Sequence, residues 1–136
     1  MTHLPRRSAA GLLTAAVLLA PAWAAPSVVK IFAYAHPPVV SALKPVREML
    51  GRQGAAVKVV EIDLDKPEAE KRLASLGLQG HVAAAVLVDG RRTFTRADGK
   101  VVEFVNFPAG SEGPAAMRGA WTTADLEAAL KQRKAP

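Results

Sequence analysis

The chain has 136 residues, no cysteine and a formal net charge of +6 at pH 7. The lack of cysteine excludes disulfide bonds, dithiol redox chemistry, thiolate metal ligands and a cysteine nucleophile. The basic residues stand in short, widely separated groups without the interleaved aromatic side chains that stack on bases, so the charge does not indicate nucleic-acid binding.

The N-terminal 24 residues have the pattern of a secretory signal peptide. Two arginines, Arg6 and Arg7, precede an apolar run at 11–20, and the small residues near Ala24 suit cleavage after that position. Because the apolar run is short for a bilayer span, we expect cleavage rather than a retained anchor. The sequence therefore predicts a signal peptide at 1–24 and one periplasmic domain at 25–136. We expect this domain to make no membrane contact once the leader is removed.

The first part of this domain has the pattern of a strand, a helix and a second strand. A nearly continuous apolar run at 27–34 is typical of a strand buried on both faces of a sheet. From Pro38 the apolar residues recur every three or four positions, which indicates a helix, and Pro45 is expected to bend it. Residues 57–62 then predict a second strand, parallel to the first and joined to it by a right-handed crossover.

An acidic segment at 63–68 follows the second strand. Its carboxylates resemble a metal site, but Asp65 stands two residues before Pro67 and fits the N-cap of another helix. The acidic residues that follow suit the first turn of that helix, and Gly77 suits its end. We therefore interpret the segment as a helix start.

The middle of the domain predicts three more strands. The first of them covers 82–88, and two antiparallel strands are expected at 92–96 and 100–107. The Asp-Gly pairs at 89–90 and 98–99 are typical of hairpin turns and separate these strands. The sequence thus predicts an α/β domain with one central mixed sheet, in the order β-α-β-α-β-β-(β)-α.

A turn-rich loop and a helix complete the chain. The loop at 108–118 is longer than a compact domain needs, so it is either functional or mobile. Thr122 or Thr123 is expected to cap a helix over 124–131, whose apolar side would pack on the sheet.

The order of these elements resembles the thioredoxin fold. Phe32 and Pro45 have the same separation as the phenylalanine and the helix proline of thioredoxins. Gly77 and Gly80, followed by a strand and the Asp-Gly turn at 89–90, match the second conserved region of that family. The similarity covers the domain from Ser27 to about residue 133.

The resemblance also implies that the chemistry of the family is missing. It places the two thioredoxin cysteines at Pro37 and Val40, and the cis-proline at Val82. A cis peptide before Val82 would cost about 3 kcal/mol, so a trans peptide is expected. The resemblance implies a thioredoxin-like domain with no catalytic residues, no cofactor and no dithiol-disulfide oxidoreductase activity.

The two histidines of the mature domain flank this region. His36 and His81 are expected to face one another across a groove. The predicted groove consists of His36, Pro37, Pro38, Val39, Val40, His81 and Val82. The nearby loop offers a possible contact with a partner through Gly110, Ser111, Glu112 and Met117.

Two functions follow from this arrangement. The first is an exported, redox-inactive binding or accessory module that docks another envelope protein through the groove and the loop. The alternative is handling of copper, nickel or zinc by His36 and His81, with Met117 or Glu112 as a further ligand, since a tight site needs a third or fourth one. A hydrolase is disfavoured because Ser41 has no visible triad.

Overall fold

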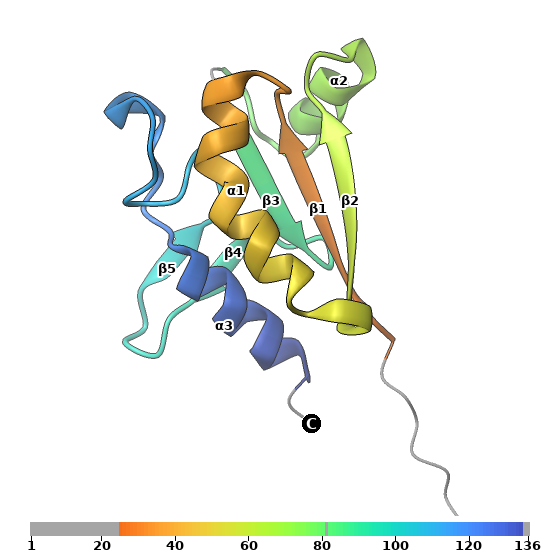
Figure 1. Ribbon diagram of the computed structural model, residues 1–136, viewed down its shortest axis with the longest axis vertical. Coiled ribbons are helices and arrows are strands. Elements are labelled where there is room, and N and C mark those ends of the chain that lie inside the picture. The colour runs from red at the N-terminus through yellow and green to blue at the C-terminus, as the bar shows by residue number, and fades with distance from the viewer. Residues whose placement is uncertain (1–24, 81, 135–136) are drawn as a thin grey trace, which may run out of the picture.

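A computed structural model of the protein describes residues 25–80 and 82–134. The predicted signal peptide, His81 and the last two residues lie outside the described residues. The described chain is mixed α/β (Figure 1). Its strands are β1 (Ser27–Ala33), β2 (Val57–Asp63), β3 (Ala84–Val88), β4 (Thr93–Thr95) and β5 (Val101–Glu103). Its α-helices are α1 (Pro37–Gly51), α2 (Pro67–Ser75) and α3 (Thr123–Lys134), with short 3-10 turns at Gly54–Ala56 and Ala115–Met117.

The first strand is the central one, as its apolar sequence predicts. The main sheet has the order β2-β1-β3. Strand β2 pairs parallel to β1 along its whole length, from Ser27↔Val57 to Ala33↔Asp63. Strand β3 pairs antiparallel to β1, with Val29 opposite Val88. The expected mixed sheet is therefore present, with β1 paired on both edges.

The hairpin strands do not belong to this sheet, which corrects the prediction of a single sheet. Strands β4 and β5 form a separate two-stranded sheet. The chain changes partner after β5, because the amide of Val86 donates to the Phe104 carbonyl at 2.8 Å and the amide of Asn106 donates to the Ala84 carbonyl at 2.7 Å. Residues 104–106 thus bond to the free edge of β3, while residues 101–103 bond to β4.

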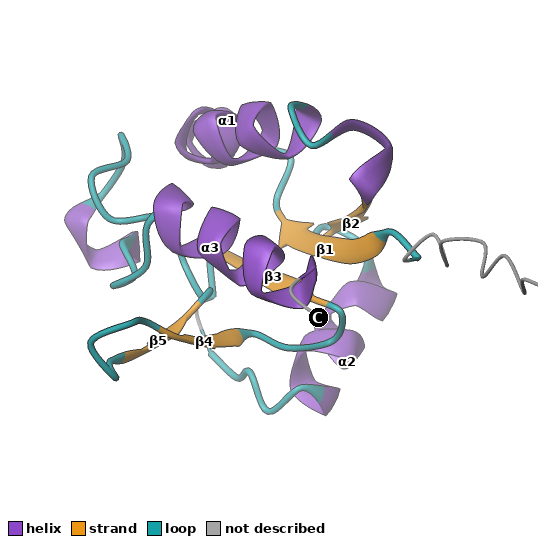
Figure 2. Ribbon diagram, turned by 90° about the horizontal axis from the view of Figure 1, so that it is seen from below, coloured by secondary structure: helices purple, strands orange, loops and turns teal. Residues whose placement is uncertain are grey.

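The helices cover both faces of the main sheet. Helices α1 and α3 lie on one face and α2 lies on the other (Figure 2). The larger apolar core includes Ile31 from β1, Leu43 from α1 and Leu126 from α3. A smaller core on the opposite face joins Phe32 of β1 to Leu73 of α2. Among the described residues no helix is long and apolar enough to cross a membrane.

Helix α2 begins without the predicted Asp65 cap. The helix starts at Pro67 with Lys66 in the N-cap position and no capping bond from a side chain. A turn in which the Lys66 amide donates to the Asp63 carbonyl at 3.2 Å sets this start one residue later than expected. The carboxylate of Asp65 lies instead 3.3 Å from Nε2 of His36.

Helix α3 begins with a reciprocal cap that also holds the hairpin. The Asp125 amide donates to Thr122 Oγ1 at 3.1 Å, and the Thr122 amide donates to Asp125 Oδ2 at 2.8 Å. Arg96, after β4, donates to both carboxylate oxygens of Asp125, at 2.8 and 2.7 Å. This Arg96 guanidinium lowers the pKa of Asp125 more than any other neighbour, and the hydrogen bonds from Thr122 act in the same direction. The carboxylate thus joins α3 to the β4–β5 hairpin.

The segment before α3 packs tightly against residues 104–107. Trp121 is fully buried, and its indole N–H donates to the Val105 carbonyl at 3.1 Å. A Cβ atom on Gly119 would clash with the Val105 carbonyl oxygen. Only glycine fits there without displacement of the backbone.

We predict that Gly119→Ala lowers the free energy of unfolding by about 1–3 kcal/mol, the range for an overpacked site. Gly51→Ala is the matched control, because Gly51 ends α1 and a Cβ atom there meets nothing within 4 Å. Urea denaturation of both variants checks this. Equal stabilities of the two variants would contradict the close contact.

We predict that Asp125→Asn destabilises the protein near pH 7 by several degrees in Tm and that this difference narrows in acid. The folded-state pKa of Asp125 lies below its ordinary value of 3.8, chiefly because of the Arg96 hydrogen bonds. The ionised Asp125 carboxylate therefore contributes its full stabilisation at pH values above the ordinary pKa of 3.8. This stabilisation is lost as the pH falls through the lower pKa of the folded state. Thermal melts from pH 7 to pH 2 measure the effect. Asp98→Asn is the control, because it changes an exposed turn, and its Tm should stay close to that of the native protein at each pH.

Candidate functional site

An apolar groove lies where β1 gives way to α1, beside the start of β3. It has a volume of about 360 Å³. Three segments form its walls, and the lining side chains are mostly aliphatic or aromatic. The groove is lined by Tyr34, His36, Pro38, Val39, Val82, Ala83, Phe107, Pro114 and Met117.

The first wall is the junction between β1 and α1. His36 is the N-cap residue of α1, and its carbonyl accepts hydrogen bonds from the amides of Val39 and Val40, each at 3.0 Å. Proline fits the first turn of a helix because no amide partner is needed there, so the Pro37-Pro38 pair starts α1 at this point. The His36 ring stacks on Tyr34 at 5.7 Å between centroids, and its Nε2 lies 3.3 Å from Asp65. Both ring contacts hold His36 at the mouth of the groove.

The second wall precedes β3, where Val82 and Ala83 run outside the regular strand. The Ala83 amide donates to Oδ1 of Asn106 at 3.0 Å, so a side chain replaces the strand partner. Asn106 has a left-handed backbone with φ of 64°. Asparagine tolerates this conformation better than most residues, which explains its presence at the site. One residue therefore fixes both the turn after residue 105 and the wall at Ala83.

The third wall is the loop at 108–118, which is fastened at its base. The Phe107 amide donates to the Met117 carbonyl at 2.8 Å, and the Gly119 amide donates to the Phe107 carbonyl at 2.7 Å. Within the loop, the Arg118 side chain donates to the Gly113 carbonyl at 3.0 Å. These bonds place Pro114 and Met117 across the groove from α1.

The structure brings together part of the predicted groove. His36, Pro38, Val39 and Val82 line it, as does Met117 of the predicted contact loop. The remaining predicted residues of the described chain, Pro37, Val40, Gly110, Ser111 and Glu112, do not line it. Val40 is 46% exposed and lies on another side of α1.

Four lining residues are absent from the sequence prediction. Tyr34, Ala83, Phe107 and Pro114 contribute to the walls. Tyr34 precedes His36 by two residues in the segment between β1 and α1, so its nearness in the sequence was a signal that could have placed it in the groove. Phe107 and Pro114 reach the groove only through the path of the loop, which spacing along the sequence does not define.

The expected metal site stays a prediction. His81 lies outside the described residues, so its position opposite His36 is not part of this structure. Within 25–80 and 82–134 no group of three or more His, Cys, Asp or Glu side chains is placed to hold a metal ion. His36 has one carboxylate neighbour, Asp65, at its Nε2 atom.

The groove is suited to holding an apolar group. Tyr34 and His36 are the titratable side chains among its described lining residues, and the rest of the lining is apolar or proline. Comparison of the chain with protein-family models, with curated proteins and with solved structures finds no match. Function is therefore inferred from the groove itself.

We predict that Asn106→Ala destabilises the protein more than Asn106→Gly. Both changes remove the acceptor for the Ala83 amide, at about 1–2 kcal/mol, but alanine adds the strain of a positive φ. Amide hydrogen exchange at Ala83 should accelerate in both variants. Asn106→Asp retains an acceptor and serves as the control. Unchanged exchange at Ala83 in the glycine variant would contradict the role given to the Asn106 side chain.

Proposed function

We propose that this protein is an exported, redox-inactive, thioredoxin-like module that binds another envelope protein. The occupant of the groove would be an extended apolar segment of that partner. The observation that carries the proposal is the apolar groove at the junction of β1 and α1, with a wall supplied by the loop at 108–118.

The arrangement of the sheet supports the thioredoxin-like part of the proposal. The central strand β1 has a parallel neighbour on one edge and an antiparallel neighbour on the other. Residues 104–106 bond to the outer edge of β3 and so take the position of a fourth strand. Helices α1 and α3 share one face and α2 takes the other (Figure 2). Pro45 lies inside α1. Of these features, the resemblance predicts the proline inside the first helix and the antiparallel strands that follow the parallel pair.

The chemistry of the lining supports a binding role. Ligand sites are mostly apolar and have volumes of roughly 300–1,000 Å³, so the groove lies at the small end of that range. A few apolar side chains of a partner would fill its volume of about 360 Å³. Their burial would supply the free energy of binding, at about 25 cal/mol for each Å² removed from water.

The anchored loop supports the same role. The bond from the Phe107 amide to the Met117 carbonyl, together with the bond from the Gly119 amide to the Phe107 carbonyl, closes the base of the loop and holds Pro114 and Met117 in place before any partner arrives. A wall that is already ordered loses little conformational entropy on binding, so more of the burial energy appears as affinity.

We predict that Pro38→Asp weakens partner binding at least about tenfold, because a carboxylate would then be buried without a partner in an apolar groove. An acidic residue in the first turn favours the helix, so α1 should remain intact. Val40→Asp is the matched control, since it adds the same charge to the same turn but outside the groove. The mature domain is immobilised, incubated with periplasmic extract, and its bound proteins are identified by mass spectrometry.

The proposal requires one defined partner that the native protein and Val40→Asp capture and Pro38→Asp does not. A synthetic peptide covering an apolar segment of that partner should then compete for capture. Equal capture by both variants, or a partner whose apolar segments do not compete, would overturn the proposal.

A further inference from the structure

A second cavity lies between the hairpin and α3. Its volume is about 700 Å³, and it is lined by Val88, Arg91, Thr93, Phe94, Thr95, Arg96, Phe104, Ala129, Gln132 and Arg133. It opens at the C-terminal end of β3, whereas the groove lies at the N-terminal end. At about 3.3 Å per residue along the strand, the two sites are roughly 15 Å apart. We call this cavity the arginine basin.

The floor of the basin is apolar and buried. Phe94 and Phe104 stack at 6.4 Å between ring centroids with an angle of 12° between their planes. Val88 and Ala129 are buried beside them. Phe104 is fully covered and Phe94 is 8% exposed, so the Phe94 ring is the aromatic part of the floor that a ligand can touch.

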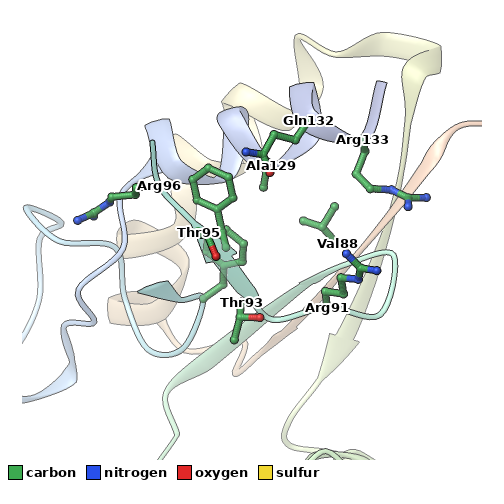
Figure 3. Close-up of a pocket in the computed structure, with 10 residues that line it drawn as sticks. Val88, Arg91, Thr93, Thr95, Arg96, Ala129, Gln132 and Arg133 are labelled. Atoms are coloured by element: carbon green, nitrogen blue, oxygen red, sulfur yellow. The ribbon is translucent and has the colours of Figure 1, made fainter. Parts of the chain in front are cut away.

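The rim of the basin is rich in hydrogen-bond donors. Figure 3 shows Arg91, from the turn after β3, and Arg133, from the last turn of α3, with their guanidinium groups on the same side of the basin. Gln132 and Thr93 add an amide and a hydroxyl to the rim. Arginine presents its donors in a planar fork that matches the oxygens of carboxylate and phosphate groups.

The two carboxylates beside the basin pair with two of its three arginines, so the third arginine keeps an unpaired positive charge in the described part of the chain. Asp89 Oδ2 accepts from Arg133 Nε at 2.8 Å, and Asp89 Oδ1 accepts from the Val28 amide. Asp125 is held by Arg96 at the other end of the basin. Among the ion pairs of the described residues, none involves Arg91. The bond that Arg133 Nε donates to Asp89 also fixes the Arg133 guanidinium, and its terminal nitrogens stay available to a ligand.

We propose that the arginine basin binds a small organic anion with an apolar body, such as an aryl phosphate. Arg91 and Arg133 hold the anionic head, while the apolar body lies against the Phe94 side of the floor. This site is separate from the groove, so its occupation does not depend on the proposed partner.

The probe for this site is phenyl phosphate, titrated into the isotope-labelled mature domain at low ionic strength and followed by amide NMR shifts. We expect saturable shifts at residues 91–95 and 129–133, which weaken as salt is added. Inorganic phosphate and phenol, which carry the head and the body alone, should each bind at least about fivefold more weakly, because each lacks one half of the contact.

Arg91→Gln is the decisive variant, because no described hydrogen bond or ion pair uses its side chain and folding should be retained. We expect it to weaken phenyl phosphate binding about tenfold, as the loss of a charge-assisted hydrogen bond does. Arg72→Gln makes the same change of charge on α2, on the opposite face of the sheet, and should bind as the native protein does. Equal affinities of Arg91→Gln and the native protein, shifts confined to the groove, or no saturable shifts would overturn the proposal.

Discussion

The position of β1 is the constraint on which the rest of the structure depends. It is hydrogen-bonded on both edges, to β2 and to β3, and it is covered on both faces. Ile31 points into the core shared with α1 and α3, while Phe32 points into the core shared with α2. Because alternate side chains of a strand face opposite ways, a shift of one residue in its pairing would exchange these two cores. The register of β1 therefore fixes the layers, and the layers fix where α1 begins and where β3 starts.

The groove forms at the edge of the main sheet, where the chain leaves β1, approaches β3 and continues into the loop at 108–118. His36 ends the extended chain, Asn106 supplies an acceptor that a strand would otherwise provide, and the segment around Phe107 carries the loop over the opening. At Ala83 and Phe107, backbone amides outside the regular strands find their partners in the Asn106 side chain and the Met117 carbonyl. The arginine basin has a different basis, since it lies between α3 and the hairpin that Asp125 and Arg96 join.

The sequence predicts the elements whose pattern is strong and local. The apolar run of β1, the periodic apolar positions of α1 and the Asp-Gly turns lead directly to the observed strands, helix and turns. Two details depend on tertiary bonds and were wrong. The Asp65 carboxylate lies beside His36 rather than capping α2, and the chain after β5 changes partner at Phe104. In the site, residues close to His36 in the sequence were predicted in part, whereas Phe107 and Pro114 arrive through a loop whose path no periodicity describes.

The packing of Trp121 gives the protein a built-in optical probe. The sequence has two tryptophans, and the other, Trp23, belongs to the proposed leader. Removal of residues 1–24, as proposed, would leave Trp121 as the sole indole, with its ring centroid 5.4 Å from that of Phe104 in an edge-on arrangement and its N–H bonded to the Val105 carbonyl. Trp121 belongs to the core that α3 covers, and it is also bonded to the backbone at Val105, shortly before the loop at 108–118. The tryptophan fluorescence of such a domain would come from one buried reporter, placed where the core meets the backbone of residues 104–107.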